Sequence, residues 1–484
     1  MVLIACFVRR YALWLTALAS LCFSCKSELS ESDVHPNIIL LMADDQGWGD
    51  VGYNEHPHLK TPHLDAMAAN GVRFDRFYAA SAVCSPTRAS VITGRHPLRM
   101  GICHANCGHI KAEEITLAEM LKAQGYTSGM FGKWHLGTLT RDTMDANRGG
   151  RPQHDLHYAP PWDHGFDVSF VTESKVPTWD PMITPPRSAG DVRPRLQEGE
   201  AFGTYYWSGA GQIVEENLEG DDSRIIMDRV IDFVRQASDA GQPFLAVVWF
   251  HAPHLPVLTG PAYRNLYADL PEDQQHYYGT ISALDAQVGR LRSQLRELQI
   301  ADNTILFYTS DNGPEGKEAS GRTQGLTNGL SGRKRSLREG GIRVPGIMEW
   351  PAKISPGTRV DVPCFTSDYL PTIADILGFD LASDDRPMDG SSFMPFVREK
   401  SRGRKQPLAF SFQEQEALIA QDFKIYSADR GKTFALYNLT EDPAEKIDLA
   451  EQEPKKVAQM VSQWRQWKAS VEASALGQDY PENH

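Results

Sequence analysis

Three short runs of mainly apolar residues constrain the fold of this chain more than any other feature. They are NIILLMA at residues 37–43, QPFLAVVWF at residues 242–250 and NTILFYTS at residues 303–310. A strand with one face in water alternates polar and apolar residues, whereas a strand covered on both faces is apolar throughout. We therefore expect these runs to be buried strands of a parallel or mixed sheet with helices on both faces.

The segments between these runs show the periodicity of amphipathic helices. Thr61 and Pro62 are typical of a helix start, and Gly71 is typical of a helix end. The clearest helix has apolar residues spaced by three and four along one face, namely Ile281, Leu284, Val288, Leu291, Leu295 and Leu298. Because strands alternate with helices, the sequence predicts an α/β fold. Its 484 residues are enough for one large domain with a small appendage.

Two later parts of the chain depart from this pattern. Residues 136–220 lack clear periodicity and are rich in Pro, Gly and aromatic residues, so we expect long loops over the sheet there. After about residue 401, a helical segment at residues 457–471 follows short strand-like runs at residues 408–412, 417–420, 423–427 and 434–439. We expect a main domain at residues 36–400 and a small antiparallel C-terminal subdomain with a terminal helix at residues 401–484.

The N-terminal segment is typical of a secretory signal. Arg9 and Arg10 precede an apolar stretch at residues 11–23, which is too short for a comfortable membrane span. We expect a signal peptide at residues 1–25 and a tether at residues 26–35. The residues before Cys25 resemble a bacterial lipoprotein site, so a lipid anchor on Cys25 and a plain cleaved signal both remain open. The expected location is secreted or periplasmic, with a membrane-anchored lipoprotein as the alternative.

The overall charge limits the class of ligand. The formal net charge is -13, whereas nucleic-acid-binding proteins usually have a basic surface. We therefore expect no nucleic-acid partner. An anionic substrate would have to bind in a local basic pocket.

The cysteines are too few to form a disulfide framework in a chain of this length. Those beyond the signal segment are Cys84, Cys103, Cys107 and Cys364. Cys103 and Cys107 could close a small loop as a disulfide in an exported protein. A zinc site with His104 and His109, or two free thiols, are the alternatives.

Oxygen-bearing side chains follow two of the predicted strands. Asp44 and Asp45 come directly after the first run, and Asp311 and Asn312 come after the third. Ligands of α/β sheets bind at the carboxyl ends of parallel strands. Carboxylate and amide oxygens favour a hard cation, so these four residues predict a site for Ca²⁺ or Mg²⁺.

A second motif places a cysteine beside an arginine. In CSPTR at residues 84–88, Ser85 can cap a helix and Pro86 can take its first position, with Gly94 at the end. Cys84 would then lie at a helix N-terminus, where the helix dipole favours negative charge, with Arg88 one turn further on.

From about residue 36 to residue 449 the chain resembles the sulfatase family of the alkaline-phosphatase superfamily, in particular bacterial arylsulfatase-like and N-acetylgalactosamine-6-sulfatase-like members. The motifs that support this resemblance are ADDQGWGD at residues 43–50, CSPTR at 84–88 with TGR at 93–95, GKWHLG at 132–137, HAPHLP at 251–256, SDNG at 310–313, Lys334 before EGGIRVP at 339–345, and LYNL at 436–439. The resemblance implies an alkaline-phosphatase-like α/β/α sandwich with a large central mixed sheet.

The resemblance also implies a mechanism for hydrolysis of sulfate esters. Cys84 would be oxidised to formylglycine (3-oxoalanine), whose hydrated geminal diol attacks sulfur and forms a covalent sulfate ester. One divalent cation, Ca²⁺ with Mg²⁺ as the alternative, would be bound by Asp44, Asp45, Cys84, Asp311 and Asn312. A formylglycine-generating or anaerobic sulfatase-maturating enzyme would have to make the modification.

Five further residues match functional positions of the family. Arg88 would stabilise the nucleophile, and Lys133 would hold sulfate oxygens. His135 would be the base that triggers sulfate release. His254 and Lys334 would bind sulfate and protonate the leaving oxygen. In the same motif as His254, His251 is not expected to be functional.

The resemblance implies a sulfated carbohydrate or aryl sulfate as substrate, which suits polysaccharide desulfation. His104, Trp162 and Trp179 could contact it, since aromatic rings pack well against sugars, although packing within the protein explains them equally. A phosphonate or phosphodiester hydrolase of the same superfamily is the alternative function. A non-catalytic, membrane-tethered glycan-binding relative is disfavoured because the functional positions are all intact, namely Cys84, Arg88, Lys133, His135 and His254.

Overall fold

A computed structural model describes residues 35–187, 197–381 and 386–480, and residues 36–484 form one compact unit. The predictions for the signal segment and Cys25 therefore lie outside the described residues. Across the described ranges, no helix combines the length and the apolar character needed to cross a bilayer. The predicted boundary at residue 401 stays a prediction.

A ten-stranded mixed sheet forms the centre of this unit. Its strand order is β12 (Thr358–Val360), β2 (Val72–Phe74), β11 (Gly346–Glu349), β9 (Thr304–Ser310), β1 (Asn37–Ala43), β8 (Phe244–Trp249), β4 (Thr127–Lys133), β5 (Val168–Thr172), β6 (Tyr206–Gly209) and β7 (Gln212–Val214). The five consecutive strands from β9 to β5 are parallel, whereas β11, β6 and β7 introduce antiparallel pairs. The predicted mixed sheet is confirmed.

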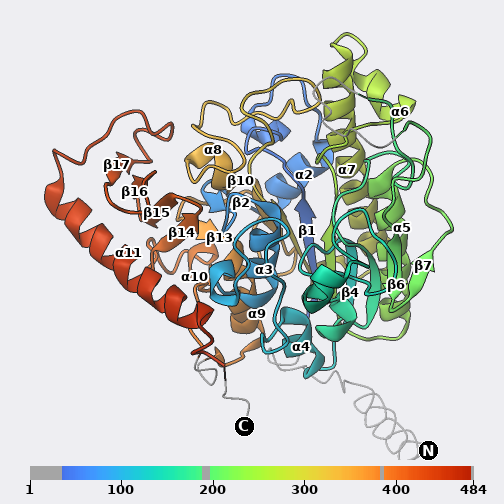
Figure 1. Cartoon of the computed structure of the whole chain (residues 1–484), viewed down its shortest axis with the longest axis horizontal. Helices are drawn as coiled ribbons and strands as arrows, with labels where there is room; N and C mark the ends of the chain where they lie inside the picture. The colour runs from blue at the N-terminus through green and yellow to red at the C-terminus, as the bar shows by residue number, and fades with distance from the viewer. Residues whose placement is uncertain (1–34, 188–196, 382–385, 481–484) are drawn as a thin grey trace, which may run out of the picture. The chain divides into compact units, whose positions relative to one another are not determined.

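Helices cover both faces of the sheet, as the apolar runs predicted. In β1, Ile38 and Leu40 belong to one buried cluster and Ile39 and Leu41 belong to another, so successive side chains point to opposite faces. The first face is covered by α3 (Cys84–Thr93), α4 (Leu117–Lys122) and α9 (Tyr369–Leu377). The second face is covered by α2 (Pro62–Asn70), α5 (Asp222–Asp239) and α7 (Glu272–Glu297), and Figure 1 shows α5 and α7 together on one side.

The expectation of loops alone at residues 136–220 is wrong in part. Strands β5, β6 and β7 lie in this segment and extend the sheet beyond β4. They are only five, four and three residues long. Such short strands at the edge of a sheet have little sequence periodicity of their own, which explains why the pattern did not indicate them.

The C-terminal part forms a second, antiparallel sheet, as predicted. Its strands are β14 (Leu408–Phe412), β15 (Gln415–Ala420), β16 (Phe423–Ser427) and β17 (Ala435–Asn438). The terminal helix α11 (Pro454–Ala475) packs on this sheet through Met460 and Trp464. In Figure 1 the sheet and α11 lie together in the orange and red part of the chain.

The end of the chain also contacts the residues that follow α3. Arg99 donates to the hydroxyl groups of Ser470 (3.0 Å) and Ser474 (2.8 Å) in α11. The guanidinium of Arg95 pairs with Asp479 at 2.6 Å. Arg95 also lies 3.4 Å from Glu114 and Arg99 pairs with Asp389 at 2.7 Å, so the end of the chain supplies only part of the polar partners of this segment.

A buried lysine joins the C-terminal sheet to the main body. The Lys424 Nζ atom of β16 lies 2.9 Å from Glu339 Oε1 and 3.0 Å from Glu445 Oε1, and all three side chains are fully buried. Glu339 begins α8 (Glu339–Ile342) and accepts a hydrogen bond from Tyr78 of β3 (Phe77–Tyr78) at 2.9 Å. Burial opposes the ammonium charge, but the two carboxylates outweigh it and raise the pKa of Lys424.

Replacing Lys424 by Met should lower the free energy of unfolding by about 3–5 kcal/mol, because two buried carboxylates lose their shared cation. The exposed residue Lys432 offers a matched control, and Lys432→Met should change stability by less than about 0.5 kcal/mol. Urea unfolding followed by fluorescence measures both. Equal stability of the two variants would show that Lys424 does not stabilise the junction.

Candidate functional site

The predicted site residues meet at the carboxyl ends of four neighbouring strands. Asp44 and Asp45 follow β1, Asp311 and Asn312 follow β9, Lys133 ends β4, and His254 lies in the loop after β8. Because the sheet order is β9, β1, β8, β4, these ends are adjacent. The topology therefore brings together residues that are far apart in the sequence.

Two buried side-chain oxygens at this edge of the sheet have no hydrogen-bond partner among the described residues. The backbone amide of Asp45 donates to Asp311 Oδ1 at 3.1 Å, and Asn312 Nδ2 donates to Asp45 Oδ1 at 2.7 Å. Asp44 Oδ1 and Asn312 Oδ1 are buried and have no hydrogen-bond partner among the described residues. Atoms of Asp44, Cys84 and Asp311 lie within 4.8 Å of one another. The carboxylate and amide oxygens of this set fit a hard divalent cation.

The carboxylates also influence each other's charge. Burial and the negative charge of Asp44 raise the pKa of Asp311 to about 7. Burial alone would raise the pKa of Asp44 as well, but the charges of Lys133, His254 and Arg88 hold it well below its ordinary value. A bound cation would favour the ionised form of both carboxyl groups.

Cys84 lies at the first position of α3 and is buried, with 2% of its surface exposed. Ser85 was predicted to cap this helix and Pro86 to begin it, but the N-cap is Val83 and the helix begins one residue before Ser85. Val83 makes no capping hydrogen bond through its side chain, and Thr87 links the first turn to the preceding segment by donating its hydroxyl to the carbonyl of Ser81 at 3.1 Å. Burial raises the pKa of the Cys84 thiol.

Three buried cations surround the acidic cluster. Arg88 Nη2 lies 2.6 Å from Asp311 Oδ2 and 3.5 Å from Asp44 Oδ2. Lys133 Nζ donates to Asp44 Oδ2 at 2.6 Å. Lys334 Nζ lies 2.6 Å from Asp45 Oδ1. Three positive groups therefore face three carboxylates, and a divalent cation would make the cluster positive overall.

Two histidines face this cluster, and a third does not. His254 Nε2 lies 3.8 Å from Asp45 Oδ2, and burial lowers its pKa to about 4. His135 Nδ1 is buried without a partner among the described residues, and burial followed by the charges of Lys133 and Arg88 keeps its pKa well below the usual value. His251 instead contacts Thr172 and Asp222 at 2.7 and 2.8 Å.

Sequence reasoning missed three polar neighbours of the site. Asn106 Oδ1 lies 2.9 Å and Ser174 Oγ lies 3.4 Å from His135 Nε2. Glu315 Oε2 lies 3.3 Å from Lys334 Nζ. Only Glu315 had a sequence signal, its position shortly after the end of β9. The other two lie in loops whose course the sequence did not predict.

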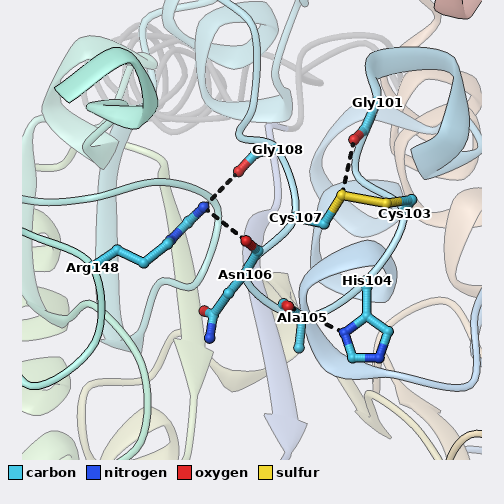
Figure 2. The surroundings of a disulfide bond; sticks show 8 residues. All are labelled: Gly101, Cys103, His104, Ala105, Asn106, Cys107, Gly108 and Arg148. Carbon is cyan, nitrogen blue, oxygen red and sulfur yellow. Dashed lines mark hydrogen bonds between the residues drawn. A yellow bond between two sulfur atoms is a disulfide. The ribbon is translucent and has the colours of Figure 1, made fainter. Parts of the chain in front are cut away.

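Cys103 and Cys107 form a disulfide, so among the alternatives the zinc site and the free thiols are excluded (Figure 2). The intervening His104 stacks on Phe412 of the C-terminal sheet, with ring centroids 5.5 Å apart.

The two candidate tryptophans also have partners within the protein. Trp162 packs against the core and donates to Tyr158 at 3.4 Å. Trp179 packs over Gly260. Contacts within the protein therefore account for these rings, and their role toward a substrate stays a prediction.

Family models and relatives of known function that match this chain are sulfatases. The family model described as Sulfatase matches residues 36–379, and the model for the C-terminal region of N-sulphoglucosamine sulphohydrolase matches residues 332–470. N-acetylgalactosamine-6-sulfatase of Sus scrofa is 34% identical over 412 residues, which cover 81% of this chain and 71% of that protein. Steryl-sulfatase of Rattus norvegicus is 31% identical over 420 residues, which cover 75% and 70%.

Solved structures share the fold over almost the whole chain. The PsFucS1 sulfatase from Pseudoalteromonas sp. superposes with a TM-score of 0.73 and 21% identity, covering 98% of this chain and 96% of that one. Ps i-CgsB in complex with k-i-k-neocarrahexaose gives a TM-score of 0.75 and 24% identity, covering 90% and 93%. At these identities the likeness establishes the architecture, which is the predicted α/β/α sandwich with a C-terminal antiparallel sheet.

Removing divalent cations with a chelator should leave the fold intact, and calcium added back should bind at one site per chain. Asp311→Asn should weaken this binding at least about tenfold, or roughly 1.4 kcal/mol, because the site loses a negative ligand. The exposed Asp302 provides the control Asp302→Asn, which should bind as the parent does. Calorimetry measures affinity and circular dichroism monitors the fold. Zinc held by these residues, or unchanged affinity in Asp311→Asn, would contradict the assignment.

Proposed function

The chain belongs to the sulfatase family of the alkaline-phosphatase superfamily and is a sulfuric ester hydrolase, and on that premise we propose that it desulfates a carbohydrate with a formylglycine at position 84 and one bound Ca²⁺. The observation that supports this most is the position of Cys84. It lies at the N-terminus of α3, within 4.8 Å of carboxylate oxygens of Asp44 and Asp311. Mg²⁺ is the alternative cation.

Residue 84 is proposed as the nucleophile once a separate maturation enzyme, formylglycine-generating or anaerobic, has oxidised it. A hydrated formylglycine supplies two hydroxyl groups on one carbon, one to attack sulfur and one to expel the sulfate afterwards. The N-terminus of α3 and Arg88 favour negative charge at this position. Arg88 is held by Asp311 and by the backbone carbonyl of Lys133 at 3.1 Å, so it needs no rearrangement to do so.

Asp44, Asp45, Asp311 and Asn312 are proposed to hold the cation, with residue 84 as a further ligand. The two unpartnered oxygens, Asp44 Oδ1 and Asn312 Oδ1, support this assignment. The cation would supply Lewis-acid stabilisation of negative charge.

The substrate's sulfate group is proposed to bind between Lys133 and Lys334. Each ammonium group donates to a carboxylate, on Asp44 and Asp45 respectively, and an ammonium has three donors in all. Each can therefore hold a sulfate oxygen without leaving its carboxylate. The chain as a whole is acidic, with a net charge of -13, so these lysines make the site a local exception.

The two histidines are proposed to move protons at opposite stages. His254, close to Asp45, would protonate the leaving oxygen of the ester, and an anionic ester bound beside it would raise its pKa. His135 would take a proton from residue 84 and so release sulfate, because its Nδ1 atom has no competing partner among the described residues.

A sulfated carbohydrate is the proposed substrate, with aryl sulfates as surrogates in assays. The name of the relative N-acetylgalactosamine-6-sulfatase refers to a sugar, and the neighbour Ps i-CgsB was solved in complex with k-i-k-neocarrahexaose. A secreted or periplasmic location, with a lipid anchor as alternative, suits such a substrate. The ratio of kcat/KM on an aryl sulfate to that on an aryl phosphonate decides between sulfatase and phosphonate hydrolase.

Cys84→Ser, in a host that leaves the serine unmodified, should release at most one equivalent of alcohol and then stop. The serine hydroxyl can attack sulfur, but once sulfated it has no second hydroxyl to expel the sulfate. Mass spectrometry of the peptide should show sulfate on the serine. Sustained turnover by a verified serine form would exclude the diol mechanism.

His254→Ala should slow a sugar sulfate by at least about 100-fold but a nitrophenyl sulfate by less than about tenfold, because a general acid matters most for a basic leaving group. The exposed His58 gives the control His58→Ala, which should match the parent on both substrates. The ratio of the two kcat values measures the effect. Equal losses on both substrates would remove His254 from the acid role.

A further inference from the structure

We propose that Asn106 is a positioning residue for His135: it fixes the tautomer of the imidazole, and the disulfide loop of Cys103 and Cys107 holds it in place. This inference rests on the proposed function, in which His135 Nδ1 accepts a proton from residue 84. The residues that position His135 lie outside the sequence motifs of the site and come from three loops.

The contact between Asn106 and His135 leaves one ring nitrogen for chemistry. Asn106 Oδ1 lies 2.9 Å from His135 Nε2, while the hydroxyl of Ser174 is more distant at 3.4 Å. An amide oxygen only accepts, so Nε2 must carry the proton. In a neutral imidazole Nδ1 is then bare, and it is the buried atom that has no partner within the described ranges.

A chain of hydrogen bonds determines which way the Asn106 amide faces. The carboxylate of Glu173 accepts from the backbone amides of Arg148 (2.9 Å) and Gly149 (2.8 Å), which cannot reverse their direction. Asn147 Nδ2 donates to the same carboxylate at 3.0 Å and to Asn106 Oδ1 at 2.8 Å. A flipped Asn106 would place two amide nitrogens against each other, so the oxygen must face both Asn147 and His135.

One covalent restraint and one set of hydrogen bonds hold Asn106 in the position in which it contacts His135. Asn106 has a positive φ of 63°, in the left-handed region that most residues avoid but asparagine tolerates. The disulfide of Cys103 and Cys107 closes the loop around it. Arg148 Nη1 donates to the carbonyls of Asn106 (3.2 Å) and Gly108 (2.9 Å), as Figure 2 shows.

The same network holds the backbone of His135. His135 has a positive φ of 58°, and its amide donates to the carbonyl of Glu173 at 3.0 Å. Glu173 therefore fixes the backbone of His135 through its carbonyl and the ring through Asn147 and Asn106. The backbone and the ring of His135 are therefore both positioned by one residue, which directly follows β5.

A double-mutant cycle tests whether Asn106 acts through His135. Asn106→Gly removes the acceptor without backbone strain, since glycine accepts a positive φ. In the parent it should lower kcat about 10- to 100-fold. In a His135→Ala background the same change should have no further effect, because the group it positions is gone. Equal losses in both backgrounds would overturn the proposal and would indicate that Asn106 binds substrate or supports the fold.

A rescue variant separates loss of the acceptor from loss of the side chain. Asn106→Asp keeps an acceptor for Asn147 and His135 and tolerates the left-handed backbone, so it should stay within about threefold of the parent. A loss as large as that of Asn106→Gly would contradict the proposal. The exposed residue Asn265 gives the control Asn265→Ala, which should behave as the parent.

Pre-steady-state kinetics identifies the step that is affected. If the positioned histidine releases sulfate, Asn106→Gly should give a burst of one equivalent of phenol from an aryl sulfate. Its kcat and KM should then fall together, with kcat/KM unchanged. A general structural defect would lower kcat/KM and give no burst.

The proposed function and this inference fail in different ways. Formylglycine content is measured by mass spectrometry for every variant, and rates are expressed per modified chain. An inactive, modified parent would contradict the proposed function, whereas an active parent with an additive cycle would contradict only the role of Asn106.

Replacing both Cys103 and Cys107 by Ala should lower kcat in the parent but not in Asn106→Gly.

Discussion

Mutual neutralisation of buried charges at the carboxyl ends of β1 and β9 is the interaction on which the rest of the site depends. Arg88, Lys133 and Lys334 would each be costly to bury alone, and so would the carboxylates they contact. Burying them together fixes side chains that come from α3, from β4 and from the long segment after β9. Burial of these charges lowers the free energy of unfolding, but the buried charges need little reorganisation when a substrate binds.

The sequence predicted most where burial is complete and least where geometry is set by loops. Residues 37–43 form β1 with the predicted bounds, because a strand covered on both faces has an unbroken apolar pattern. The acidic residues after β1 and β9 could be placed for the same reason, since parallel strands end at one edge. Strand β6, by contrast, has four residues at the sheet margin and gave no signal.

The contact that positions His135 is a part of the site that the sequence did not predict. Asn106 precedes His135 by 29 positions, in a loop with neither periodicity nor a motif. Their contact depends on a left-handed turn, a disulfide and the docking of a third loop through Asn147. Asparagine tolerates the left-handed turn, and the disulfide was one of the alternatives for the two cysteines, but the docking of the third loop is a tertiary interaction that no local propensity indicates. The start of α3 lies two residues before the predicted one, because Val83 rather than Ser85 takes the cap position.

The contacts between the segment after α3 and the end of the chain have a consequence for synthesis on the ribosome. Arg95 and Arg99 lack their partners Asp479, Ser470 and Ser474 until the last residues have emerged. The surroundings of Cys84, which is only 2% exposed in the finished protein, need Asp311 and Lys334 as well, so they are incomplete until residue 334 has been made. The stretch of chain between residues 84 and 334 thus gives an interval during synthesis in which another enzyme can reach this thiol.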